Sequence, residues 1–334
     1  MFEGTLIVSF KSPTHPSFLV DDAYRKRAHG RTRPNRSAGL QLSSALHESG
    51  KSPELKRIWA LGTSLMRSQS PASPLSQPNT IGVIGGVSVL STLIFLEKLA
   101  YWSSRDGKEC LPFVACSDPE LSQELSFHTP LGSPRSRSAE IQLNQGAVIE
   151  NLRTKRNFLQ QSGAGCLVMP CHISHAWHSE VSEDCPLPFL HIGDCVTMEL
   201  KKAKLKPIGA ASTVRIGVLT TDAILVASYY REKLQSQGFE VVLPDKATQE
   251  QTLVPAMEAL NRKDMKGAQN LMRIAIQVLL VGDVNVVILA SDYLQGLLPQ
   301  NDPLLKKCLD PTDALARSTI QWAKSMEKVP DNFF

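Results

Sequence analysis

Short apolar runs alternate with longer amphipathic stretches from about residue 80 onward. The runs are rich in Val, Ile and Leu and are bounded by Gly, Pro or polar residues, as is typical of buried parallel strands. They predict strands at residues 81–84, 111–118, 163–171, 215–221, 239–245 and 284–291. The stretches between them predict helices at residues 88–102, 145–161, 223–236 and 252–281. Strands that alternate with helices predict an α/β fold with parallel sheets.

The order of these elements is repeated once along the chain. IGVIGG, LPFVACSD and CLVMPC follow one another in the first half, and IGVLTT, FEVVLPD and VVILAS in the second. We place two α/β domains at residues 79–195, with an added C-terminal helix at 306–334, and at residues 196–305. Each half ends a buried strand at a small nucleophilic residue, Cys171 or Ser291. Ligands of open parallel sheets bind at the carboxyl ends of strands, so we expect one cleft between the domains.

Residues 1–78 have a different composition from the rest of the chain. They contain 11 Lys and Arg, 5 Asp and Glu, 13 Ser and 7 of the 21 Pro, with no sustained helical or strand period. An N-terminus rich in Arg and Ser and poor in acidic residues is typical of an organelle transit peptide. A disordered tail without a targeting role is the alternative, which Glu3 and the other acidic residues favour. A nucleic-acid-binding arm is less favoured, because no aromatic residue interleaves the Arg block.

The remaining composition argues against several classes of partner. Residues 79–334 carry 25 Lys and Arg against 27 Asp and Glu, so we expect no nucleic-acid partner. The longest apolar run, at 81–96, is shorter than the roughly 20 residues that span a membrane, and we expect no membrane partner. The 7 Cys are scattered without a C-x-x-C pair, which indicates thiols in a reducing compartment rather than a disulfide scaffold.

The richest group of chemical side chains is MPCHISH at residues 169–175. Cys171 ends an apolar strand and is followed by His172, His175 and His178. A helix N-terminus and a neighbouring imidazolium would stabilise a thiolate base at Cys171. Cys171 and His175 are also spaced for one helix face and could share a zinc ion, although no second ligand pair completes such a site. A buried structural Cys with surface His residues is the third interpretation, and the residues alone leave all three open.

Two further turns follow predicted strands. GVIGG is neither a dinucleotide-binding fingerprint nor a P-loop, but its backbone and the helix amides beyond Ser88 could hold a carboxylate. Ser291 in VVILASDYL is a poor base without a partner. A hydrolase using Ser291 is therefore a minor alternative, and the sequence does not give the orientation of Asp292.

These motifs resemble the aspartate/glutamate racemase family, and within it an aspartate-racemase-like plant branch that is targeted to plastids. The resemblance covers about Thr80 to Ala323. It rests on IGVIGGVSVLST, on GAGCLVMPCHISH with PLPFLHIGD, on RIGVLTT with Tyr230, and on VVILASDYL with LDPTDALA.

The resemblance implies an isomerase that is a PLP-independent amino-acid racemase. It implies two similar flavodoxin-like domains related by pseudo-twofold symmetry, no cofactor, no metal, a small carboxylate or amino-acid substrate and a possible homodimer. In this family two thiols flank the α-carbon of the substrate; one removes the α-proton and the other returns a proton to the opposite face. Cys171 corresponds to the first catalytic Cys, Gly85, Gly86 and Ser88 to the opening loop, and His175 to a family His.

The chain departs from the family at several of these positions. Ser291 stands where the family has its second catalytic Cys, and Asp292 and Tyr293 replace the Thr and Glu that follow. His172 and Ile173 replace the Asn and Thr after the first Cys. We expect Cys171 and Ser291 to hold the catalytic positions. We expect the substrate to be bound by Gly86, Ser88, His172, His175 and Asp292.

The departures leave three functions open: a racemase that uses Cys171 as its base, a one-base decarboxylase or isomerase, and an inactive ligand-binding relative. The related arylmalonate decarboxylases resemble single-Cys members of the same superfamily. Asp292 would repel an acidic substrate unless a cation such as Lys263, Lys266 or His172 compensates its charge.

The N-terminal segment supplies the first testable prediction. A fluorescent reporter fused behind residues 1–78 should accumulate in the plastid stroma of plant cells, because the Arg-rich, Ser-rich segment has the composition of a transit peptide. Confocal microscopy checks this result. A diffuse cytoplasmic signal would contradict it.

Overall fold

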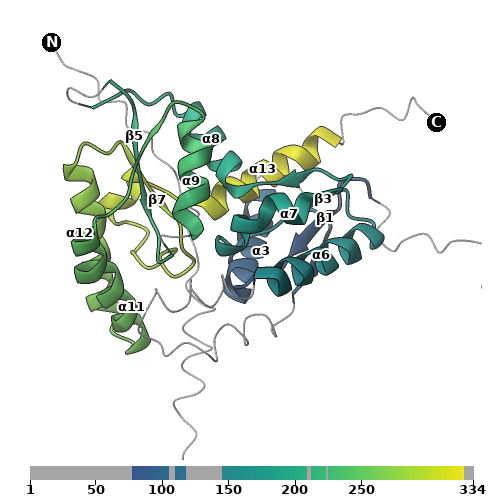
Figure 1. Ribbon diagram of the computed structural model, residues 1–334, viewed down its shortest axis with the longest axis horizontal. Helices are drawn as coiled ribbons and strands as arrows, with labels where there is room; N and C mark the ends of the chain where they lie inside the picture. The colour runs from purple at the N-terminus through teal and green to yellow at the C-terminus, as the bar shows by residue number, and fades with distance from the viewer. Residues whose placement is uncertain (1–76, 105–109, 118–144, 209–211, 223–224, 327–334) are drawn as a thin grey trace, which may run out of the picture. The chain divides into compact units, whose positions relative to one another are not determined.

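The computed structural model describes residues 77–104, 110–117, 145–208, 212–222 and 225–326 (Figure 1). The N-terminal segment predicted at residues 1–78 lies outside this part of the chain except for its last two residues. None of the helices within the described ranges combines the length and the apolar character needed to cross a membrane.

The first half of the described chain forms a four-stranded parallel sheet. Its strands are β1 (Ile81–Ile84), β2 (Phe113–Cys116), β3 (Cys166–Val168) and β4 (Phe189–Leu190), in the order β2-β1-β3-β4. Ile81 is paired with Phe113 on one side and with Cys166 on the other. Helices α3 (Val89–Ser104) and α6 (Gln145–Gln161) follow β1 and β2.

The second half repeats this topology. Its strands are β5 (Arg215–Leu219), β6 (Glu240–Val242), β7 (Val286–Leu289) and β8 (Cys308–Leu309), in the order β6-β5-β7-β8. All three pairings are parallel, and the order corresponds strand for strand to that of the first sheet. The predicted α/β fold with parallel sheets is therefore confirmed.

Helices are found at the four amphipathic stretches that predicted them, the last with one interruption, and several other helices were not predicted. The remaining helices are η1 (Ile173–Trp177), α7 (His178–Ser182), α8 (Ile192–Lys202), α9 (Leu225–Gln235), α10 (Lys246–Thr248), η2 (Gln249–Leu253), α11 (Val254–Asn261), α12 (Met265–Val281), η3 (Pro303–Lys307) and α13 (Pro311–Met326). The single helix predicted at 252–281 is divided because Lys263 adopts a φ of 64°. Asp264 then starts α12 by accepting a hydrogen bond from the backbone N–H of Gly267 at 2.8 Å.

The C-terminal helix begins later than the predicted residue 306. Residues 303–307 form the short helix η3, and Cys308 and Leu309 pair with β7 as β8. Asp310 then caps α13, because its carboxylate accepts from the backbone N–H groups of Thr312 and Asp313. Short-range turn chemistry therefore fixes the start of α13 at Pro311.

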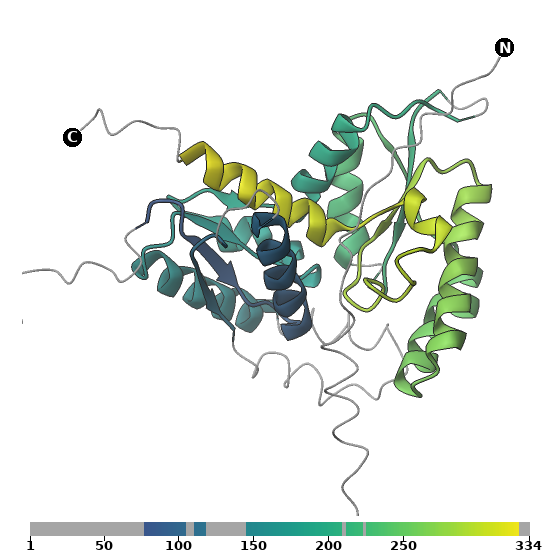
Figure 2. The same cartoon turned by 180° about the vertical axis from the view of Figure 1, so that it is seen from behind.

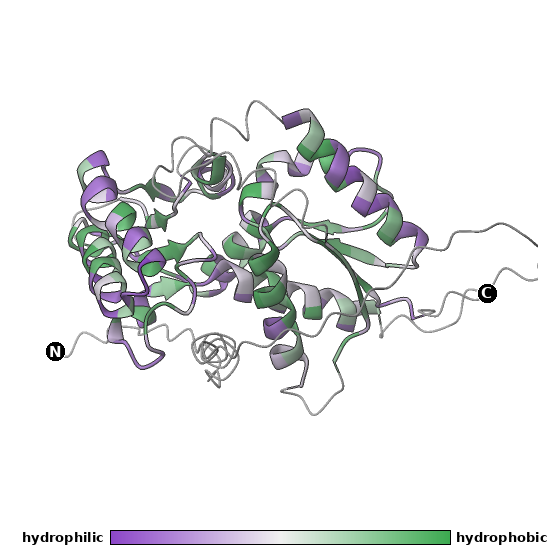
Figure 3. Cartoon of the chain, turned by 90° about the horizontal axis from the view of Figure 1, so that it is seen from below, coloured by the Kyte–Doolittle hydropathy of each residue, from purple (hydrophilic) through white to green (hydrophobic). Residues whose placement is uncertain are grey.

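The alternation of side chains along each strand divides the core into three clusters. The strands of the sheets are mostly coloured as hydrophobic in Figure 3. One face of β1 and one face of β7 contribute Val83 and Ile288 to the same large cluster, together with apolar residues of α13. The opposite faces contribute Ile84 and Leu289 to separate clusters under α6 and α12. Successive strand residues point to opposite faces, which explains why both faces of these continuous apolar runs are buried.

A buried ion pair connects the first long helix to the last, and Figure 2 shows α3 and α13 side by side. Lys98 of α3 contacts the carboxylates of Asp310 and Asp313, the latter at 3.4 Å. Burial alone would lower the pKa of Lys98, but Asp310 and Asp313 raise it above its usual value. The lysine therefore stays charged between two acidic partners.

We expect the Lys98→Ala substitution to reduce the free energy of unfolding by about 3–5 kcal/mol, because it leaves two carboxylates without their buried counter-ion. Chemical denaturation monitored by circular dichroism measures the change. Lys202→Ala is the matched control, because the Lys202 side chain is 54% exposed beside Glu199 and such pairs contribute at most about 1 kcal/mol. Equal losses for the two variants would contradict the structural role of Lys98.

Candidate active site

Cys171 lies against the loop that follows β1. Its side chain is buried, three residues beyond Val168, where β3 ends. A Cβ atom on Gly86 would lie 2.4 Å from Cys171 Cβ and 2.2 Å from Ser174 Oγ. Only glycine allows this approach of backbone to side chain.

The same loop places Cys171 at the N-terminus of α3. The backbone N–H of Ser88 donates to Cys171 Sγ at 3.4 Å, and Ser88 Oγ accepts from the backbone N–H of Ser91 at 3.4 Å. Ser88 therefore caps α3 with its side chain and contacts the thiol with its backbone. The positive end of a 16-residue helix and one N–H donor face the sulfur.

His172 and His175 after Cys171 are buried, whereas His178 is partly exposed. His175 Nε2 donates to the carbonyl of Met169 at 2.6 Å, and its ring packs against His178, His191 and Tyr229. Burial is the main cause that lowers the pKa of His178 to about 4 and that of His191 to about 3. Burial also holds the pKa of His175 well below its usual value.

His172 is likewise neutral at pH 7. Burial lowers its pKa, although Asp292 and Asp310 act in the opposite direction. The burial of His172 therefore disfavours the interpretation in which an imidazolium lies beside Cys171, because desolvation outweighs the nearby carboxylates. Among the described residues, no three His, Cys, Asp or Glu side chains are arranged to hold a metal ion.

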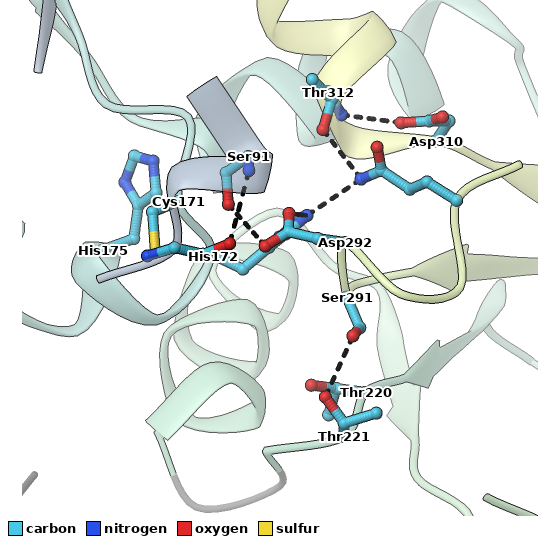
Figure 4. A network of polar contacts seen from close by, with 12 residues as sticks. Ser91, Cys171, His172, His175, Thr220, Thr221, Ser291, Asp292, Asp310 and Thr312 are labelled. Atoms are coloured by element: carbon cyan, nitrogen blue, oxygen red, sulfur yellow. Dashed lines mark hydrogen bonds and ion pairs between the residues drawn. The ribbon is translucent and has the colours of Figure 1, made fainter. Parts of the chain in front are cut away.

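Ser291 pairs with a hydroxyl of the neighbouring strand end. Its Oγ lies 3.0 Å from Thr221 Oγ1, and Figure 4 shows the Ser291 side chain directed toward Thr221. This pair forms because β5 and β7 are adjacent in the sheet and end in register at Leu219 and Leu289. In the described part of the chain, no imidazole or carboxylate is hydrogen-bonded to the Ser291 hydroxyl, so a hydrolase mechanism lacks a base.

Asp292 connects the loop after β7 to residues of the first half. Its Oδ2 accepts from Ser91 Oγ of α3 at 2.5 Å, and its Oδ1 lies 3.9 Å from His172 Nε2 (Figure 4). The side-chain nitrogen of Gln295 lies 3.1 Å from His172 Nε2 and 2.8 Å from Thr312 Oγ1. One polar network therefore joins residues of four elements. They are Ser91 of α3, His172 at the N-cap of η1, Asp292 and Gln295 of the loop after β7, and Thr312 of α13.

The structure distributes the predicted site residues over three groups. Gly86, Ser88 and Cys171 are in contact; His172 contacts Asp292; and Ser291 contacts Thr221. His175 lies in the neighbouring cluster of rings. Lys263 and Lys266, suggested as counter-ions of Asp292, are both exposed, the first in the turn before α12 and the second in the first turn of α12.

Several residues of this network were missed by the sequence analysis. Ser91 lies one helical turn after Ser88 in a stretch that predicts only a helix. Gln295 directly follows the motif VVILASDYL, and Thr312 lies within LDPTDALA, where the sequence gives its side chain no partner. Tyr229 is a further omission: burial raises its pKa well above the usual value, and Cys171 and Asp292 both add to the shift. The phenol therefore lies within electrostatic range of both residues.

The fold, with a cysteine just beyond a strand end, can be compared with those of known proteins. The Asp/Glu/Hydantoin racemase family model matches residues 84–319, and the chain belongs to this family. An aspartate racemase homologue from Pyrococcus horikoshii OT3 has a similar structure, with a TM-score of 0.58 and 21% identity over 74% of this chain and 99% of that chain. The aspartate racemase of Picrophilus torridus gives a TM-score of 0.53 and 20% identity over 73% of this chain and 94% of that chain.

A sequence relative covers part of the same region. An uncharacterized protein in the pnlA 3′ region of Pectobacterium carotovorum subsp. carotovorum is 26% identical over 147 residues, which are 44% of this chain and 92% of that protein. The solved structures show that the two repeated sheets form a two-domain flavodoxin-like fold similar to that of these aspartate racemase structures.

The histidine cluster makes stability depend on pH. Unfolded His residues bind a proton near pH 6.5, whereas folded His178 and His191 do so only near 4 and 3. The unfolded state therefore gains protons first as the pH falls, and each histidine should reduce the free energy of unfolding by about 1.4 kcal/mol per pH unit between pH 6.5 and its folded pKa. Urea unfolding at pH 7 and pH 5 measures this slope, which His178→Phe should reduce. A free energy that stays constant between these pH values would contradict buried neutral histidines.

Proposed function

We propose that the protein is a cofactor-independent enzyme that removes the α-proton of a small amino acid, with Cys171 as the base, in the manner of an amino-acid racemase. The contact that carries the proposal is the hydrogen bond from the Ser88 N–H to Cys171 Sγ at the N-terminus of α3. A thiolate at Cys171 would accept the α-proton of the substrate and become a thiol. Membership of the Asp/Glu/Hydantoin racemase family supports the same reaction type.

Removal of an α-proton places negative charge on the carboxylate of the substrate, which must be stabilised by fixed donors. The hydroxyls of Ser291 and Thr221 carry two O–H groups between them, and the hydrogen bond that joins them uses only one. The second O–H is then available to a substrate oxygen. In this proposal Ser291 stands at the second catalytic position mainly as a hydrogen-bond donor.

The return of the proton decides the outcome of the reaction. The Cys171 thiol can return its proton to the face from which it came, which exchanges the α-proton without inversion. Inversion requires an acid on the other face, where the hydroxyl of Ser291 is bound to Thr221 and has no acidic or basic partner of its own among the described residues. This observation favours a one-base enzyme, such as a decarboxylase or an isomerase, as the second candidate function.

The direct test is α-proton exchange by the full chain in deuterated water. We expect NMR to show loss of the α-proton signal of at least one amino acid, and chiral chromatography to show inversion that is slower than exchange. Cys171→Ala should lower the exchange rate by about 10²–10⁴-fold, the usual contribution of a positioned base. Cys110→Ala is the matched control, because that thiol is exposed. An absence of exchange with every amino acid would contradict the proposed activity and favour a ligand-binding relative.

A second thiol should restore the missing acid. Ser291→Cys places a more acidic group at the second position, so the ratio of inversion to exchange should rise by at least about tenfold relative to the unmodified chain. The same NMR and chromatographic measurements give this ratio. An unchanged ratio would show that Ser291 does not face the substrate.

A further inference from the structure

We infer that the carboxylate of Asp292 receives the ammonium group of the substrate, and that the protein therefore selects amino acids without an acidic side chain. This inference rests on the proposed function for the position of the substrate. Asp292 becomes the residue that determines which amino acids bind.

The hydrogen bonding of Asp292 is incomplete. Its side chain is only 9% exposed, and its Oδ2 accepts from Ser91 Oγ. Its Oδ1 is buried without a hydrogen-bond partner among the described residues. His172 Nε2 is 3.9 Å away, which is too long for a hydrogen bond. A buried carboxylate oxygen without a donor is costly, and a ligand N–H group would satisfy it.

The charge of Asp292 is also uncompensated. His172 is its ion-pair partner in the described ranges, and that imidazole is neutral at pH 7 because burial lowers its pKa. The buried lysine of the neighbouring network, Lys98, is already shared between Asp310 and Asp313. A cationic ligand would supply the missing charge, and ammonium combines a positive charge with N–H donors.

Asp292 is placed to bring that ammonium close to the proposed base. It directly follows Ser291, and it contacts Ser91 one turn along α3 from Ser88, whose N–H touches Cys171 Sγ. Cys171 and Asp292 also both contribute to the raised pKa of the Tyr229 phenol. An amino acid whose ammonium contacts Asp292 therefore has its α-carbon in the neighbourhood of Cys171.

The Asp292 carboxylate also disfavours the binding of substrates with an acidic side chain. Like charges repel most strongly where water is excluded, and no described lysine or arginine is ion-paired to Asp292 to offset a second carboxylate. Selectivity of this kind arises from a repulsive element as well as from an attractive one. A neutral or basic side chain avoids the repulsion.

Isothermal titration calorimetry with the full chain tests the inference. L-alanine, L-lysine, L-aspartate and propylamine are titrated into the unmodified chain, into Asp292→Asn and into Asp283→Asn. Asparagine keeps the shape of Asp292 and an oxygen for Ser91, whereas Asp283 is an exposed carboxylate in a left-handed turn that asparagine tolerates.

We expect alanine and lysine to bind the unmodified chain at least ~10-fold more tightly than aspartate. Asp292→Asn should weaken the binding of alanine and propylamine by at least ~10-fold and reduce the difference in affinity between alanine and aspartate. Asp283→Asn should leave all affinities unchanged. Tighter binding of aspartate than alanine, unchanged discrimination in Asp292→Asn, or no binding of any probe would overturn the inference.

These measurements distinguish a failure of the inference about Asp292 from a failure of the proposed activity. Asp292-dependent binding of alanine without α-proton exchange would retain the inference and reject the proposed activity. Exchange on aspartate that is equal in Asp292→Asn would retain the proposed activity and reject the inference.

Discussion

The hydrogen bond between Asp292 and Ser91 is the contact on which the arrangement of the site depends. It joins the loop at the end of β7 to α3, and α3 is the helix whose N-terminus contacts Cys171. Because Ser291 directly precedes Asp292, the same contact fixes where the second strand end lies relative to that helix. Gly86 completes the constraint, since any side chain at this position would displace Cys171.

Charge in this region follows from burial. His172 and His175 are neutral because burial lowers their pKa values, and for His172 this desolvation outweighs the attraction of Asp292 and Asp310. Lys98 shows the opposite balance, because two carboxylates contact it directly and keep it charged despite its burial. The difference between these two cases is one of distance: the carboxylates touch Lys98 but lie farther from His172.

Much of the fold could be predicted from the sequence, because each buried parallel strand is a continuous apolar run and each long helix has an amphipathic period. The helix predicted at residues 145–161 is α6 with the same bounds. β4 and β8 were missed because two-residue edge strands are too short to show a period. Helix α8 was missed because its N-cap is His191, whose Nδ1 accepts from Gly193, and histidine is not a common capping residue.

The site was predicted in part. The spacing of Cys171 after an apolar strand and of the Gly-Gly turn before a helix identified residues that do come into contact. The sequence could not pair Ser91 with Asp292 or Gln295 with His172, since these partners are more than 100 positions apart. It also could not show that the histidines are buried, because their neighbours alternate between polar and apolar residues.

A double-mutant cycle between Ser91 and Asp292 tests the central constraint most directly. Ser91→Ala, Asp292→Ala and the double variant are compared with the unmodified chain by their free energies of unfolding in urea. A direct, charge-assisted hydrogen bond predicts a coupling energy of about 1–3 kcal/mol, so the double variant should lose less stability than the sum of the single variants. Strictly additive losses would contradict the claim that this contact joins the loop of Ser291 to the helix that holds Cys171.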